Sequence, residues 1–212
     1  PFFFFAAALM ETGGLVRRLV NLANALVGHL RGGLGMTAVL SCMMFAAISG
    51  SSPATVAAVG RVLYPSLVKE GYSPRYAIGS IATAGSLGIL IPPSIPMILY
   101  GFITETSITR LFLAGVVPGL IYGFGLLIMA RFLAVRTKVP LRPKATWAER
   151  GAALRSAGPA LLLPVFIFVG IYGFPHFALF GVSYEGGAIF TPTEAAVMAT
   201  ALALVIGLIV YR

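Results

Sequence analysis

Two short stretches rich in hydroxyl-bearing residues and glycine interrupt apolar segments of this chain. They are residues 49–55 (SGSSPAT) and 85–94 (GSLGILIPPS). Where a helix stops inside a membrane, its free carbonyls and nearby Ser or Thr oxygens can replace the water around a cation. The amides at the start of the next helix can hold an anion. Either stretch alone could be a simple turn or kink, but the pair predicts a site for a cation and a carboxylate.

The first stretch lies within residues 33–70. The apolar run before it, about residues 34–48, is too short to cross a bilayer comfortably. Ser52 is expected to be the N-cap of a second helix with Pro53 at its first position. A helix, a polar break and a second helix can form either one interrupted transmembrane span or a re-entrant hairpin. The membrane topology of the flanking segments decides between the two.

The second stretch lies within residues 75–105. Pro92, Pro93 and Pro96 fall close together there. Each proline lacks an amide hydrogen and obstructs the preceding turn, so an uninterrupted helix is excluded. The sequence predicts a broken transmembrane helix, whose exposed backbone must be shielded from lipid.

The composition indicates a membrane protein. Of the 212 residues, 58% are hydrophobic and 10% are charged, and the mean hydropathy is strongly positive. Several segments must therefore lie in lipid. The fold class predicted is all-α: a polytopic helical membrane protein with a re-entrant helical hairpin and a discontinuous transmembrane helix.

The formal net charge of +9 comes mainly from residues between the apolar runs, which argues against a nucleic-acid partner. Seven basic residues crowd one connecting segment: Arg131, Arg136, Lys138, Arg142, Lys144, Arg150 and Arg155. The positive-inside rule places that segment in the cytoplasm. Traced backwards from there, residues 33–70 enter and leave the membrane on the same face, which favours the hairpin.

The remaining segments follow from the same pattern. Residues 1–13 are expected to be the end of a transmembrane helix, and residues 14–32 are expected to form an amphipathic interfacial helix. Transmembrane helices are expected over 108–136 and 158–180, with a basic cytoplasmic loop or interfacial helix over 137–157 between them. Residues 190–212 are expected to form a further helix. Thr191 and Glu194 fit a capping box at the start of the last helix, so Glu194 is predicted to be a cap. Both ends of the chain look cut.

No catalytic centre is predicted. The single cysteine, Cys42, lies in an apolar run, and all six acidic residues are Glu. The sequence contains no nucleophile motif, zinc-protease motif or phosphate-binding loop. The chain is therefore expected not to be an enzyme and to need no cofactor.

Five stretches together resemble a known family. They are 45–55 (FAAISGSSPAT), 71–72 (GY), 88–95 (GILIPPSI), 111–119 (LFLAGVVPG) and 190–196 (FTPTEAA). Their order and spacing are similar to those of the large membrane subunit, DctM-like, of tripartite ATP-independent periplasmic (TRAP) transporters. The resemblance covers nearly the whole chain, which looks like the first repeat and the opening of the second, so residues 190–212 would start the second repeat.

The resemblance implies an elevator-type carrier of the ion-transporter superfamily, in which a transport domain moves against a scaffold. Such a carrier would use Na⁺ as coupling ion and import small organic acids, such as C4-dicarboxylates, sialic acid or other carboxylates. It would lie in the bacterial inner membrane as a multi-pass protein. Its implied partners are a small membrane subunit (DctQ-like), a periplasmic substrate-binding protein (DctP-like), the carboxylate substrate and membrane lipid.

The resemblance also assigns site residues by position. The predicted sodium ligands are Ser49, Gly50, Ser51, Ser52, Thr55, Gly88, Pro92 and Ser94. The predicted substrate contacts are Ser52, Pro53, Thr55, Pro93 and Ser94. No other metal is expected.

Three alternatives remain. One is a sodium/carboxylate symporter of the same superfamily that works without a binding protein. The others are an intramembrane enzyme and a purely structural membrane protein. Sodium-dependent uptake separates them.

Overall fold

The protein is described here by a computed structural model. It describes residues 2, 5–6, 8–9, 13–135, 143–173, 177–179, 182–184 and 189–210. The α-helices are α2 (Leu15–Val27), α3 (Gly33–Ser49), α4 (Ser52–Lys69), α5 (Pro74–Gly85), α6 (Ile95–Ile103), α7 (Ile108–Val135), α8 (Trp147–Tyr172) and α9 (Pro192–Val205). A 3₁₀ turn η1 (Ser86–Ile89) follows α5, and a π turn η2 (Ile206–Val210) follows α9.

The prediction of an all-helical fold is confirmed, apart from one small β-hairpin. Strands β1 (Phe177–Leu179) and β2 (Val182–Tyr184) pair antiparallel, with Phe177 opposite Tyr184. The sequence had assigned part of this region to a transmembrane helix over 158–180. The structure instead ends α8 at Tyr172, where Gly173 adopts a positive φ of 77°.

The start of α8 also differs from the prediction. The helix begins at Trp147 rather than at 158, because Thr146 and Glu149 form a capping box. Arg150 and Arg155 therefore belong to a helix that continues into an apolar stretch. Of the basic segment, Arg136, Lys138 and Arg142 lie outside the described residues, as does most of the helix end predicted over 1–13.

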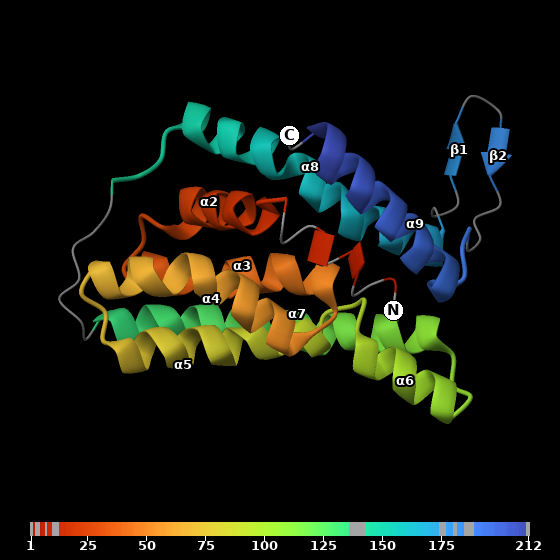
Figure 1. Ribbon diagram of the computed structural model, residues 1–212, viewed down its shortest axis with the longest axis horizontal. Helices are drawn as coiled ribbons and strands as arrows, with labels where there is room; N and C mark the ends of the chain where they lie inside the picture. Colours follow the sequence, from red (N-terminus) through yellow and green to blue (C-terminus); the bar gives the residue numbers. More distant parts are fainter. Residues whose placement is uncertain are drawn as a thin grey trace.

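The described helices run mostly side by side along the longest axis (Figure 1). Helices α3, α4, α5 and α7 form one group, α8 and α9 lie along the opposite edge, and α2 lies between them. The short helix α6 extends from the end of the molecule where α3 and α4 are joined.

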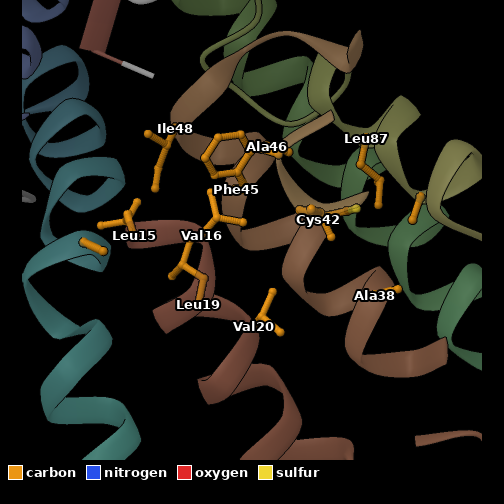
Figure 2. Packing of buried hydrophobic residues seen from close by; sticks show 14 of the residues in the cluster. Leu15, Val16, Leu19, Val20, Ala38, Cys42, Phe45, Ala46, Ile48 and Leu87 are labelled. Atoms are coloured by element: carbon orange, nitrogen blue, oxygen red, sulfur yellow. The ribbon is translucent and has the colours of Figure 1, made fainter. Parts of the chain in front are cut away.

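Helix α2 is amphipathic and packs its apolar face on α3. Leu15 and Leu19 are fully buried and lie toward Phe45 of α3, while Arg17 and Asn21 on the other face are exposed. Figure 2 shows this cluster, in which Cys42 is also enclosed. Burying such side chains contributes about 1.5–3 kcal/mol each, which fixes α2 against the hairpin.

Within the described residues, two helices are long and apolar enough to cross a membrane: α7, over Ile108–Ala134, and α8, over Trp147–Tyr172. Two shorter apolar helices cover Gly33–Ser49 and Pro192–Leu208. Helix α3 is shorter than α7 and α8 because it ends at the polar break after Ser49.

Candidate functional site

The joint between α3 and α4 is a tight polar turn. Gly50 follows α3 in the left-handed conformation (φ 62°), and its amide donates to the Ala46 carbonyl at 3.2 Å. Ser51 is extended and caps α4, and its carbonyl accepts the Thr55 amide at 3.0 Å. The prediction that Ser52 is the N-cap is therefore wrong by one position, because Ser52 is already helical and Pro53 is the second helical residue.

Three residues of this turn, Ser49, Ser51 and Thr55, form what we call the tip cluster. The hydroxyl oxygens of Ser49 and Thr55 lie 2.8 Å apart, and both side chains are fully buried. The Thr55 hydroxyl donates to the Ser51 carbonyl at 2.8 Å, and the Ser49 hydroxyl reaches the same carbonyl at 3.3 Å. The turn thus gathers neutral oxygens with no ionisable side chain among them.

The second break follows α5. The chain tightens into η1, leaves helical geometry, and resumes as α6 at Ile95. Ser94 closes this segment, because its hydroxyl donates to the Ile89 carbonyl at 2.6 Å. Pro92, Pro93 and Ser94 are all buried, so this non-helical backbone is shielded by the protein.

The two breaks touch each other. The Ile95 amide, at the start of α6, donates to the Gly50 carbonyl at 3.1 Å. A Cβ on Gly50 would lie 2.5 Å from the Pro93 carbonyl oxygen, and one on Gly88 would lie 2.7 Å from both the Ser51 carbonyl oxygen and the Thr55 hydroxyl. Glycine at both positions is therefore what allows the two segments to approach so closely.

Helix α7 supports the second break with a row of glycines. A Cβ on Gly115 would lie 2.8 Å from the Leu90 carbonyl oxygen, and one on Gly119 would lie 3.0 Å from the Ile91 side chain. This role of the glycines was not predicted from the sequence. The spacing of four residues between these glycines, typical of close helix packing in membranes, could have indicated it.

The structure brings most of the predicted site residues together. Those at the contact between the two breaks are Ser49, Gly50, Ser51, Thr55, Gly88, Pro93 and Ser94. Ser52 and Pro53 lie beside it, in the first turn of α4, where Ser52 is half-buried and Pro53 is exposed.

Three other residues of these stretches contact different parts of the molecule. Pro92 lines a narrow apolar cleft together with side chains of α7 and α8. The Ser86 hydroxyl donates to the Thr83 carbonyl at 2.7 Å, and its oxygen lies 3.2 Å from the Tyr122 hydroxyl oxygen. Gly85 packs against Val56. Helical phase directs the latter two away from the tip cluster.

The chemistry of this contact suits a weakly held cation. Hydroxyl and carbonyl oxygens are the ligands of hard cations. No group of three or more His, Cys, Asp or Glu side chains that could hold a metal ion occurs in the described part of the chain.

The capping box at Thr191 is confirmed. The Thr191 amide donates to the Glu194 carboxylate at 2.8 Å, so Glu194 caps the start of α9 as predicted.

Comparison with known proteins matches the chain over residues 1–212 to the family model described as the DctM component of tripartite ATP-independent periplasmic transporters. The C4-dicarboxylate TRAP transporter large permease protein DctM of Pseudomonas aeruginosa is 49% identical over 212 residues, which are 100% of this chain and 46% of that relative. The protein of the same name from Vibrio cholerae is 46% identical over 100% of this chain and 44% of its own length.

The ectoine/5-hydroxyectoine TRAP transporter large permease protein UehC of Ruegeria pomeroyi is 42% identical, again over 100% of this chain and 46% of the relative. The chain thus spans less than half the length of these curated relatives. The resemblance stated from the motifs is confirmed, and the chain belongs to the DctM family of TRAP transporter large permeases.

Proposed function

We propose that this chain is part of a membrane subunit that couples sodium entry to the import of a small organic acid. The observation that carries the proposal is the contact between two helix breaks, where the Gly50 carbonyl accepts the Ile95 amide at 3.1 Å beside a buried pair of hydroxyls. Membership of the DctM family supports transport rather than catalysis or a purely structural role.

The tip cluster supports the choice of ion. Ser49 and Thr55 are fully buried and offer hydroxyl oxygens, and Ser51 adds a carbonyl. Removing an ion from water requires replacement oxygens, and neutral ones hold it loosely enough for release. We therefore assign the tip cluster, with Gly50, Ser52, Gly88 and Ser94 as further ligands, to one sodium site. Pro92, also predicted as a ligand, is left out because it lines a cleft with α7 and α8.

The carboxylate would lie where helices begin. Helices α4 and α6 start at Ser52 and Ile95, beside the two breaks. Helix N-termini carry partial positive charge and attract anions. Ser52, Pro53, Thr55, Pro93 and Ser94 are the proposed substrate contacts. Curated relatives are named for C4-dicarboxylate, ectoine and isethionate transport, so we propose the class of small organic acids rather than one member.

The α3–α4 hairpin and the broken α5–α6 segment would move together as part of an elevator-type transport domain, because the Gly50–Ile95 hydrogen bond and the close approach at Gly88 join them. We further propose a DctQ-like small subunit and a DctP-like periplasmic binding protein as partners in the inner membrane.

The test is uptake by the full-length protein, reconstituted in vesicles with its small subunit and binding protein. We expect labelled carboxylate to accumulate when an inward sodium gradient is imposed, and not when potassium replaces sodium. Equal uptake in potassium buffer would contradict sodium coupling. Uptake that persists without the binding protein would favour a binding-protein-independent symporter.

A further inference from the structure

A groove of about 700 Å³ lies between α2 and the start of α8. Its lining residues are Asn21, Asn24 and Ala25 of α2, Pro143, Lys144, Ala145 and Thr146 of the preceding segment, and Glu149 and Ala153 of α8. The two helices are tied near the groove, because Arg18 donates to the Ser156 hydroxyl at 3.0 Å. The groove is thus formed by two elements that the chain holds together.

One basic residue lines this groove and a second lies beside it. Lys144 is exposed and lines the groove. Arg17 is exposed one helical turn before Asn21, on the same face of α2. The exposed Asn21 side chain adds an amide donor to the wall.

One carboxylate, that of Glu149, is among the residues lining the groove. It is committed to the helix start: its Oε2 accepts the Thr146 amide at 2.7 Å and the Thr146 hydroxyl at 3.0 Å. This negative charge is held at the helix start, where it offsets the partial positive charge of the α8 N-terminus. The remaining charges near the groove favour an anion.

The position of the groove along α8 indicates what kind of anion. The charged residues of α8 all fall between Trp147 and Ser156, and no charged residue follows in the helix up to Tyr172. If the apolar part of α8 lies in hydrocarbon, the groove lies at the depth of lipid headgroups. Trp147 is 84% exposed at this level, as expected for an aromatic side chain at a membrane interface.

We propose that the groove binds the phosphate-bearing headgroup of an acidic phospholipid, with Lys144 facing the phosphate and Arg17 and the Asn21 amide beside it. A lipid held between α2 and α8 would anchor the amphipathic helix at the interface. The assignment is independent of which substrate or ion the protein transports.

The test is native mass spectrometry of the full-length protein titrated with phosphatidylglycerol or phosphatidylethanolamine. We expect tighter binding of phosphatidylglycerol. Because each basic residue near an anionic headgroup contributes about 1 kcal/mol, Lys144→Gln should weaken phosphatidylglycerol binding by about fivefold, and the Lys144→Gln/Arg17→Gln pair by about 25-fold. Lys144 is exposed and precedes α8, so the single variant tests the proposal even if the pair fails to fold.

The matched control is Arg75→Gln, which removes the same charge from an exposed position on α5, at the opposite edge of the molecule in Figure 1. It should change phosphatidylglycerol binding by less than about twofold if the groove acts locally. The proposal is overturned if the two lipids bind equally, if Arg75→Gln weakens binding as much as Lys144→Gln, or if inorganic phosphate binds as tightly as phosphatidylglycerol.

Discussion

The Ser49–Thr55 hydroxyl pair has two properties that suit a buried ion site: each hydroxyl has a hydrogen-bond partner, and each oxygen keeps a lone pair. A buried hydroxyl without a partner costs about 1–3 kcal/mol, and here each hydroxyl has a partner within the turn. The same oxygens keep lone pairs that a cation can use. The hydroxyls of the cluster are therefore satisfied by one another and by the Ser51 carbonyl, and in the proposed site a sodium ion would replace some of these hydrogen bonds.

Substituting Thr55 tests this function directly. Thr55→Val keeps the shape but removes the hydroxyl that contacts both Ser49 and the Ser51 carbonyl. We expect the sodium concentration for half-maximal uptake to rise at least about tenfold, because interactions of a charged group with such an oxygen contribute about 1.5–3 kcal/mol. Thr55→Ser, which restores the hydroxyl, should stay within about threefold. Unchanged sodium dependence in a normally folded Thr55→Val protein would remove Thr55 from the site.

Residue types in the sequence indicated which segments meet better than they indicated the local geometry. Hydroxyls and glycines in two breaks correctly indicated which segments meet, since Ser49, Thr55 and Gly88 lie in contact. The cap was misplaced from Ser51 to Ser52, because two adjacent serines both satisfy the N-cap preference and only backbone geometry separates them. The direction of Ser86 could not be predicted, because it depends on the phase of the η1 turn.

At the level of secondary structure, the sequence correctly predicted the two breaks, after α3 and after α5, but it did not predict where α8 begins. Pro53 marks the start of α4, and the adjacent Pro92 and Pro93 mark the second break, because two successive residues there lack an amide donor. Isolated prolines do not break helices in this protein: Pro65, Pro118, Pro159 and Pro164 lie inside α4, α7 and α8. The start of α8 was missed although Thr146 and Glu149 have the same spacing as the capping box recognised at Thr191. Residues 137–157 were predicted to be a basic cytoplasmic loop or an interfacial helix, so a helix was allowed there. Its continuity with the apolar helix expected from residue 158 was not predicted.

The contact between the hairpin and the broken helix depends on Gly88. A methyl group in Gly88→Ala would be forced against the Ser51 carbonyl and the Thr55 hydroxyl, so we expect a loss of about 1–3 kcal/mol in stability. Gly79→Ala is the matched control in α5, because no atom lies within 4 Å of its added Cβ, and it should be neutral or stabilising by up to about 1 kcal/mol. Thermal unfolding of the purified full-length variants measures both. Equal unfolding temperatures for the two would contradict the close approach of the breaks.

At the scale of the whole molecule, helix α7 has one face packed against the other described helices and one exposed face. Its glycines at 115 and 119 face the second break, and Gly123 faces Met43 of α3. Large apolar side chains form a stripe on the exposed side: Leu113, Val117, Ile121, Phe124 and Ile128 are between 57% and 70% exposed. Small residues inside and large apolar residues outside are the pattern expected when the outer solvent is lipid.

Ile121 provides the test, because it lies near the middle of α7 and is 68% exposed. On a lipid-facing surface, Ile121→Lys would place a charge near the centre of the bilayer, which costs about 2.5–3.5 kcal/mol on insertion scales. We expect the amount of membrane-inserted full-length protein to fall severalfold, while Ile121→Leu remains at the wild-type amount. On a water-facing surface the lysine would change stability by no more than about 0.5 kcal/mol. Normal insertion of Ile121→Lys would therefore show that this stripe does not face hydrocarbon, and α7 would need a different place in the assembly.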